Sequence, residues 1–174
     1  MTDLDKLFRE FNQPLVRYLT RRLGDRDWAE EVAQETFLRA ARQGDIVSER
    51  SWLFAVATNL VRDEAKKDAR RRRHLELLAL EAKAEQPVAP QLLTLERAED
   101  AAAARRALDA LGERDREALL MREEGLNYTE IAEALSLSVA SVGTTLARAR
   151  RRLVEAYEAL QGVSKDGRGN HAAS

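Results

Sequence analysis

Apolar residues recur at steps of three and four along most of the chain, a spacing that places them on one face of an α-helix. One such stripe covers residues 4–23, where we expect Pro14 to kink the helix, and a second covers residues 27–41. A third helix is predicted to begin with Ser51 as its N-cap and to continue into the basic run DEAKKDARRRR. Together these segments predict a three-helix unit over residues 1–74.

The chain changes character over residues 75–100, where acidic residues outnumber basic ones and Pro87 and Pro90 interrupt any helical pattern. This segment is predicted to be a flexible acidic linker. Apolar periodicity resumes after it and predicts a second helical unit over residues 101–161. The small, polar, glycine-containing residues 162–174 predict a disordered tail. The predicted fold class is all-α, with two small helical domains joined by a flexible linker.

The clearest local pattern is LNYTEIAEALSLSVASVGTTLARARRRL, at residues 126–153. Asn127 stands where an N-cap is needed, and Glu130 follows at the spacing of a capping box. Residues 135–137 are predicted to form a turn, after which Ser138 caps a second helix. Two short helices with defined starts and a tight turn between them are typical of a helix-turn-helix motif.

The second helix of this motif leaves small polar side chains exposed in its N-terminal half, the half that enters a major groove. Arginines crowd its C-terminal half, where they either meet DNA phosphates or complement the helix dipole without any DNA. The capped motif beside them favours DNA binding. The candidate contacts with upstream DNA are Ser138, Ala140, Ser141, Thr144, Arg148 and Arg151.

Composition narrows the class of protein. Charged residues make up 34% of the chain and aromatic residues 5%, which favours helices, while the net charge of -1 gives no global attraction to nucleic acid. The absence of cysteine and the presence of only two histidines argue against a catalytic triad, a metal site or a cofactor, so we expect no catalytic residues and no enzyme. Because the opening residues MTDLDKLFREF are charged and no apolar run is long enough for a membrane span, we expect a cytoplasmic protein.

Both halves of the chain resemble bacterial sigma factors of the extracytoplasmic-function (ECF) group. The N-terminal resemblance rests on LFREFNQPLVRYLTRRLGDRDWAEEVAQETFLRAAR and SWLFAVATNLVRDEAKKDARRRR, which are similar to sigma region two. The C-terminal resemblance, to region four, rests on ALDALGERDREALLMREEGLNYTEIAEALSLSVASVGTTLARARRRL. The resemblance implies an alternative sigma factor that binds core RNA polymerase, recognises a promoter and helps to separate its strands.

The resemblance also implies roles for residues of the N-terminal half. The outward face of the second helix would dock on the clamp helices of the largest polymerase subunit, although a solvated acidic face is the plain alternative. That face consists of Glu30, Glu31, Gln34 and Glu35. The loop at 43–50 and the helix after it would bind the downstream promoter element and hold a base out of the stack. The candidate downstream contacts are Asn59, Arg62, Lys66, Lys67 and Arg70.

Trp52 and Asn59 each have two competing interpretations, and Gly143 removes one contact that the resemblance would otherwise imply. Trp52, in the first turn of a helix, is more typical of a core residue than of a stacking platform, and Asn59 either contacts DNA or bonds to nearby backbone. Gly143 stands where many relatives carry a basic residue, so a guanidinium fork to guanine is missing there. Upstream recognition would then depend on Ser141, Thr144, Arg148, the helix N-terminus and DNA shape.

The resemblance implies three partners: core RNA polymerase, promoter DNA and an anti-sigma factor, with a monomer expected when the chain is free. The main alternative is a stand-alone helix-turn-helix regulator, which would dimerise through its N-terminal helices and bind a palindrome unaided. A helical adaptor that binds only proteins is a third hypothesis. It predicts that charge reversal at Arg148 and Arg151 changes nothing.

Overall fold

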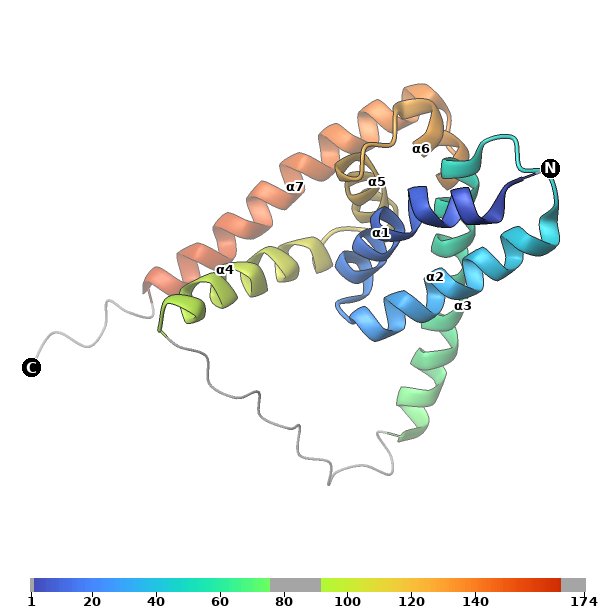
Figure 1. The fold of residues 1–174 in the computed structure, drawn as a ribbon. Coiled ribbons are helices and arrows are strands. Elements are labelled where there is room, and N and C mark those ends of the chain that lie inside the picture. Colours follow the sequence, from blue (N-terminus) through green and yellow to red (C-terminus); the bar gives the residue numbers. More distant parts are fainter. Residues whose placement is uncertain (1, 76–91, 167–174) are drawn as a thin grey trace, which may run out of the picture. The chain divides into compact units, whose positions relative to one another are not determined.

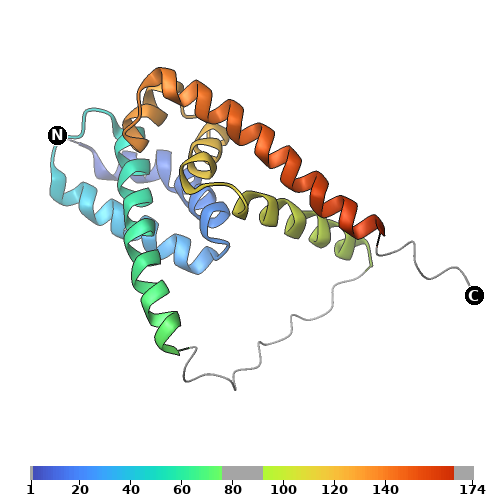
Figure 2. The same ribbon diagram turned by 180° about the vertical axis from the view of Figure 1, so that it is seen from behind.

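The computed structural model describes residues 2–75 and 92–166, apart from the side chains of residues 66, 69–75, 92–96 and 163–166. Within these ranges the chain forms seven α-helices and no strand, which confirms the all-α prediction. The helices separate into two compact units, one from each half of the chain (Figures 1 and 2).

The first unit contains three helices, α1 (Leu4–Leu23), α2 (Arg26–Gln43) and α3 (Glu49–Leu75). These are the three helices that the apolar stripes predict. Pro14 lies inside α1, and the helix continues past it to Leu23. The first unit is therefore a bundle in which each helix contacts the other two.

A tight connection at Gly24 and Asp25 lays α2 against α1. Gly24 has a left-handed backbone (φ 76°), which glycine adopts without steric cost, and its N–H donates to the carbonyl of Thr20 at 2.7 Å. The Asp25 carboxylate accepts the backbone N–H of Trp28 at 3.1 Å and so caps the next helix. One residue ends α1 and its neighbour starts α2.

The start of α3 corrects the sequence prediction that Ser51 is its N-cap. The helix begins at Glu49, and the backbone N–H of Trp52 donates to the carbonyl of Ser48 at 2.9 Å. Ser51 is 3% exposed, and its hydroxyl donates to the Ser48 carbonyl at 3.3 Å. Because the Ser51 side chain is turned into the first helical turn, it cannot cap the helix.

The core of the first unit joins aliphatic and aromatic side chains from all three helices. Tyr18 is fully buried; its ring packs against Phe54 with centroids 5.1 Å apart, and its hydroxyl hydrogen-bonds the Thr58 hydroxyl at 2.7 Å. The indole N–H of Trp28 donates to the Glu64 carboxylate, which ties the start of α2 to α3. These two contacts pair polar groups across helices, as burial favours.

The second unit contains α4 (Leu92–Asp109), α5 (Glu113–Glu123), α6 (Tyr128–Leu135) and α7 (Val139–Asp166). Helix α7 packs against the other three, and α4 runs alongside it in both views (Figures 1 and 2). Val142, Leu146 and Ala149 of α7 are fully buried, whereas Leu153, the next apolar residue on the same face, is only partly buried.

Two predicted boundaries of the second unit need correction. Helix α4 begins at Leu92, so the last part of the predicted linker, up to residue 100, is helical. Helix α7 continues to Asp166, past the predicted start of the tail at residue 162. The rest of the predicted linker, residues 76–91, and of the tail, residues 167–174, lies outside the described residues.

Candidate functional site

The first helix of the helix-turn-helix motif, α6, starts with a complete capping box. The backbone N–H of Glu130 donates to the Asn127 side-chain oxygen at 2.8 Å, and the backbone N–H of Asn127 donates to the Glu130 carboxylate at 3.1 Å. Two backbone donors that a helix N-terminus would otherwise leave unpaired are satisfied by local residues. The predicted capping box is confirmed.

The turn between α6 and α7 is closed at Ser136. This residue has a left-handed backbone (φ 55°, ψ 47°), and its N–H donates to the carbonyl of Ala132. The N–H of Leu137 donates to the same carbonyl at 2.9 Å. Two hydrogen bonds to the end of α6 thus fix the direction in which α7 departs.

The exposed N-terminal part of α7 begins with a pair of serines. The Ser138 hydroxyl accepts the backbone N–H of Ser141 at 3.1 Å, so the predicted N-cap is confirmed, and the two hydroxyls hydrogen-bond each other at 2.7 Å. Ala140 and Thr144 are also exposed, and the Thr144 hydroxyl lies 3.5 Å from the Ala140 carbonyl. These four small side chains leave the first turns of α7 open to close approach by another surface.

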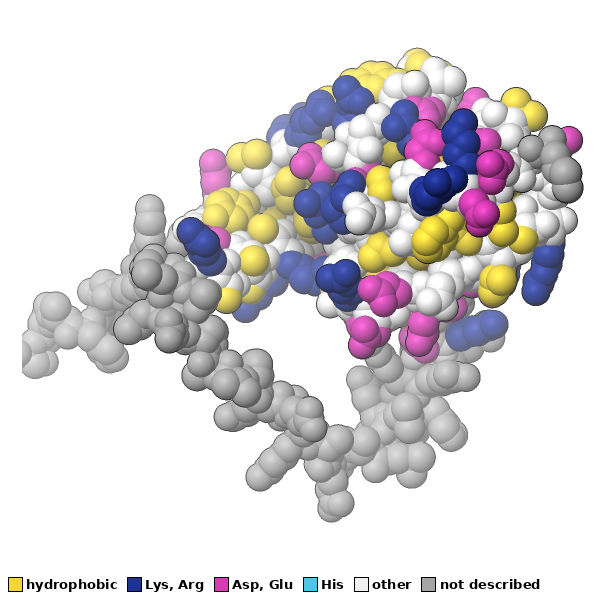
Figure 3. All heavy atoms as spheres, in the orientation of Figure 1, with side chains coloured by type: hydrophobic (Ala, Val, Ile, Leu, Met, Phe, Trp, Pro, Cys, Tyr) yellow, Lys and Arg dark blue, Asp and Glu magenta, His cyan; other side chains and the backbone are white. Residues whose placement is uncertain are grey.

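Arg148, a candidate DNA contact, is held by an ion pair to α5. Its side chain is 38% exposed, and Nε and Nη2 donate to the two carboxylate oxygens of Asp115 at 3.1 and 2.7 Å. Arg152 donates to the same carboxylate at 3.1 Å. Arg151 and Arg152 are both exposed. Basic side chains line the outer edge of α7 (Figure 3).

Asp115 itself is almost fully buried, in the first turn of α5. The hydrogen bond from Arg148 holds the pKa of this carboxyl below its usual value, and burial opposes that shift. The same contact raises the pKa of Arg148. A carboxylate that receives three charge-assisted hydrogen bonds stays ionised and joins α5 to α7.

Gly143 lies where α7 passes close to α6. A side-chain carbon at this position would be 3.7 Å from the ring of Tyr128, which is ordinary van der Waals contact. The guanidinium of Arg122 lies 5.8 Å from the centre of the same ring. The glycine is therefore not required by space, and α7 carries no cation at this position.

In the first unit, the predicted outward face of α2 is present. Glu30, Glu31 and Gln34 are exposed, and Glu35 is partly exposed. Two of the acids have partners on α2 itself, since Glu30 pairs with Arg26 at 3.2 Å and Glu35 pairs with Arg39 at 3.3 Å. Exposed pairs of this kind contribute about 0–1 kcal/mol to stability, so an approaching partner exchanges them at little cost.

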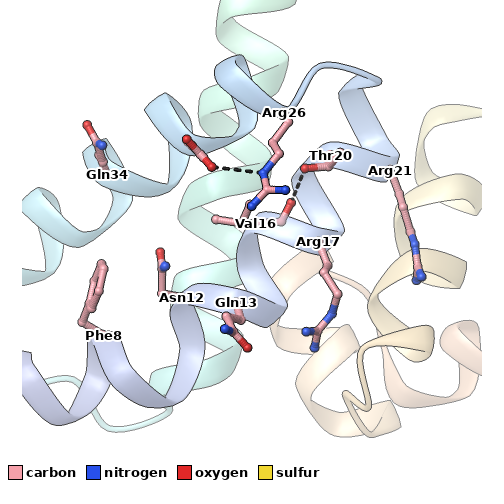
Figure 4. A pocket seen from close by; sticks show the side chains of 10 residues that line it. Phe8, Asn12, Gln13, Val16, Arg17, Thr20, Arg21, Arg26 and Gln34 are labelled. Carbon is pink, nitrogen blue, oxygen red and sulfur yellow. Dashed lines mark hydrogen bonds and ion pairs between the residues drawn. The ribbon is translucent and has the colours of Figure 1, made fainter.

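This acidic face of α2 borders a groove of about 560 Å³ between α1 and α2. Phe8 and Asn12 lie on the α1 wall and Gln34 lies on the α2 wall (Figure 4). Phe8 is 47% exposed and contacts Phe37 edge to face, with ring centroids 5.1 Å apart. The groove also contains Gln13, Val16, Arg17, Thr20, Arg21, Arg26 and Glu30.

The predicted downstream contacts lie on α3 at helical spacing. Asn59 and Lys67 are exposed, and Arg62 is partly exposed. The backbone of Lys66 and Arg70 belongs to α3, but their side chains lie outside the described residues. Because steps of three and four keep residues on one face of a helix, 59, 62, 66 and 70 share a face.

A hollow of about 380 Å³ lies between the end of α2 and the start of α3. Trp52 and Val56 line it from α3, at positions that extend the face of Asn59 by further helical steps. Arg39 and Arg42 line it from α2, together with Gln43. Trp52 is partly exposed, so this residue belongs to the surface hollow as well as to the packing of the unit.

Sequence reasoning missed three groups of residues at these surfaces. Asp115 is 33 positions from Arg148, and no local pattern signals a contact at that distance. Arg39 and Arg42 occupy the outer side of an ordinary amphipathic helix, and only the packing of α3 places them beside Trp52. Phe8 is part of the apolar stripe of α1, which by itself predicts a buried residue.

None of the helices in the described part of the chain combines the length and apolar character needed to cross a membrane.

Residues 7–71 match the family described as Sigma-70 region 2, and residues 101–153 match the family described as Sigma-70, region 4. The region 2 match lies within the first structural unit, and the region 4 match lies within the second.

Individual relatives extend these matches over most of the chain. The chain is 34% identical over 143 residues to the ferric citrate uptake sigma factor FecI of Escherichia coli, covering 78% of this chain and 79% of FecI. It is 30% identical over 155 residues to the RNA polymerase sigma factor YlaC of Bacillus subtilis, covering 86% and 89%. Among solved structures, the fold is similar to that of the sigma factor RpoE of Bartonella quintana, which was solved in complex with the anti-sigma factor NepR. The TM-score is 0.60 and the sequence identity 22%, and the match covers 86% of this chain and 95% of RpoE.

Proposed function

The chain belongs to the extracytoplasmic-function group of the sigma-70 family, and on that premise we propose which of its surfaces perform each step of transcription initiation. It is an alternative sigma factor, which binds core RNA polymerase, recognises promoter DNA and assists strand opening. The stand-alone regulator is not favoured, because the N-terminal unit matches sigma region 2.

Upstream promoter recognition is assigned to α7, with α6 bracing it. The observation that carries this assignment is the motif geometry: a capped α6, a fixed turn and an α7 whose first turns are exposed and lined by small side chains. A helix presented in this way fits the major groove. Ser138, Ala140, Ser141 and Thr144 face the bases, and Arg148 and Arg151 face bases or phosphates nearby.

Docking on core polymerase is assigned to the outward face of α2. Glu30, Glu31, Gln34 and Glu35 supply carboxylates and an amide to basic partner side chains, and the adjoining groove receives apolar ones against Phe8. An apolar centre bordered by charges is the usual composition of a specific protein interface. The α1 wall therefore joins the α2 face in one docking surface.

Capture of the melted downstream strand is assigned to α3 and the hollow at its start. Extruding a base costs a few kcal/mol, which a pocket with an aromatic wall and a basic groove offsets. The hollow lined by Trp52, Arg39 and Arg42 receives the base, and the face of Asn59, Arg62, Lys66 and Arg70 follows the backbone, with Lys67 beside it. This hollow is the pocket that the sequence alone does not reveal.

The remaining partner is an anti-sigma factor. The RpoE relative was solved bound to NepR, and a protein of the same kind would hold this chain inactive. We further propose that the chain works in the cytoplasm as a monomer when free, and that it performs no catalytic step itself, because the polymerase carries out RNA synthesis.

The docking assignment is tested by reversing charge on α2. Replacing Glu31 and Glu35 together with Lys places like charges against the basic partner groups, and we expect at least about tenfold weaker binding to core polymerase. Glu10→Lys, an exposed reversal on α1 outside the groove lining, is the control to be compared with each single reversal as well as the double variant, and it should bind normally. Circular dichroism establishes that each variant is folded. Equal affinity of the double variant and the control would remove α2 from the interface.

A further inference from the structure

Asp115 stands out because a buried carboxylate holds two arginines of the recognition helix. It is 3% exposed, on α5, and it accepts hydrogen bonds from Arg148 Nε, Arg148 Nη2 and Arg152 Nη1. The apolar residues Val142, Leu146 and Ala149 of α7 are fully buried in the core of the same unit. The contact therefore holds the two arginine side chains in place and also joins α5 to α7.

The hydrogen-bond geometry determines which part of Arg148 stays available. A guanidinium carries five N–H donors, and Asp115 takes the Nε–H and one Nη2–H. The two Nη1 hydrogens and the second Nη2 hydrogen are not used in this contact, and they include the end-on pair that binds two acceptors at once. The Arg148 side chain is 38% exposed, so part of it is accessible from solvent.

Arg148 also lies on the face of α7 that carries the candidate base contacts. The steps from Ser141 to Thr144 and from Thr144 to Arg148 are three and four residues, which keeps all three on one side of the helix. Gly143 supplies no cation to this face. A fixed Arg148 is thus the first cation along it, about two and a half turns from the helix start at Val139.

From this geometry, and resting on the proposed sigma function, we infer that Asp115 is a positioning residue for upstream promoter recognition: it holds the end-on fork of Arg148 toward paired DNA acceptors. The acceptors are guanine N7 and O6, the pair of acceptors that an end-on guanidinium matches in the major groove. A mobile arginine loses rotamer freedom when it binds, and Asp115 removes that loss in advance.

Positioning of Arg148 by Asp115 and plain charge repulsion between Asp115 and DNA predict opposite effects of Asp115→Asn on DNA affinity. Asp115→Asn removes a negative charge beside DNA, which by itself strengthens binding to any sequence. If Asp115 positions Arg148, the variant instead loses about tenfold in affinity for specific DNA relative to random DNA, because the arginine must be ordered on binding. Asp109→Asn is the control for charge: it removes the same charge from a half-exposed carboxylate whose partners, Arg105 and Arg116, do not lie on α7.

The experiment uses holoenzyme assembled from the full chain and core polymerase, with a promoter fragment that the wild-type holoenzyme selects from randomised duplex DNA. The specific-to-random ratio of affinities is measured for Asp115→Asn, Arg148→Ala and the double variant. We expect each single variant to lose about tenfold and the double variant to lose no more than Arg148→Ala alone. An equal further loss from Asp115→Asn in the Arg148→Ala background would mean that Asp115 acts only on the fold, and would overturn the inference.

Two further arms complete the test. Arg148→Lys keeps the charge and the ion pair but has no fork, so it should lose the ratio as Arg148→Ala does; an unchanged ratio overturns the inference even if Asp115→Asn fails to fold. Base substitutions and salt titration check the acceptor. A preference lost at one G·C base pair supports guanine, whereas a salt slope reduced by about 0.9 with an unchanged specific-to-random ratio indicates a phosphate contact and overturns the inference. If wild-type holoenzyme selects no sequence, the proposed function itself fails, which is distinct from failure of this inference.

Discussion

Replacing Ser136 with glycine should stabilise the second unit. Ser136 holds a left-handed backbone (φ 55°, ψ 47°) at the turn that directs α7. That conformation costs a residue with a side chain about 1–2 kcal/mol relative to glycine. Glycine also makes the unfolded chain more flexible, which offsets about 0.4–1 kcal/mol. We therefore expect a net gain of about 0.5–1 kcal/mol in the free energy of unfolding, or about 2–8 °C in the melting temperature of a domain of this size.

The two units can be followed separately in this experiment. Both tryptophans, Trp28 and Trp52, lie in the first unit, so tryptophan fluorescence reports that unit, whereas circular dichroism at 222 nm reports both. The Ser136→Gly variant should raise the dichroism transition of the second unit and leave the fluorescence transition in place. Ser136→Ala keeps the side-chain carbon and should give no gain. A transition that is unchanged or lowered in Ser136→Gly, or an equal rise in Ser136→Ala, would show that the left-handed backbone at Ser136 carries no such cost.

Three further outcomes are expected. The folded-state pKa of Asp115 lies below its ordinary value of 3.8, so its stabilising contribution is complete above pH 3.8 and is lost as the pH falls through the folded pKa. Urea unfolding should therefore show a stability difference between wild type and Asp115→Asn that is constant from neutrality down to pH 3.8 and shrinks below it. Gly143→Ala should raise the free energy of unfolding by about 0.5–1 kcal/mol, since the new methyl group meets Tyr128 at ordinary contact distance and alanine favours the helix; a loss of stability in thermal melting would contradict that contact. Trp52→Ala should reduce permanganate reactivity of promoter thymines, which reports strand opening, without weakening binding to core polymerase; normal opening would exclude the hollow as the site of base capture.

Local signals in the sequence predict the helix-turn-helix motif well. Asn127, Glu130 and Ser138 make their hydrogen bonds within three residues of themselves, so the chain around each one determines its structure. The same locality explains the failure at the start of α3. Ser48 and Ser51 are both acceptable caps by residue type, and only the burial of Ser51 in the unit decides between them.

Features that depend on tertiary packing were not predictable. The acidic residues before position 101 favour a linker by composition, yet α4 starts at Leu92 and packs along α7. The pairing of Asp115 with Arg148 joins two helices across 33 positions, and it changes Arg148 from an exposed side chain into a held one. The hollow at Trp52 likewise exists only because α2 ends beside the start of α3.

Action of this chain through core polymerase can be measured by titrating the labelled full chain with sigma-free bacterial core polymerase. Fluorescence anisotropy at near-physiological salt is the appropriate readout, because low ionic strength exaggerates non-specific attraction between charged surfaces. We expect saturable, tight, one-to-one binding that the Glu31 and Glu35 reversals weaken. Absence of saturable binding by a folded, inhibitor-free chain would contradict action through core polymerase.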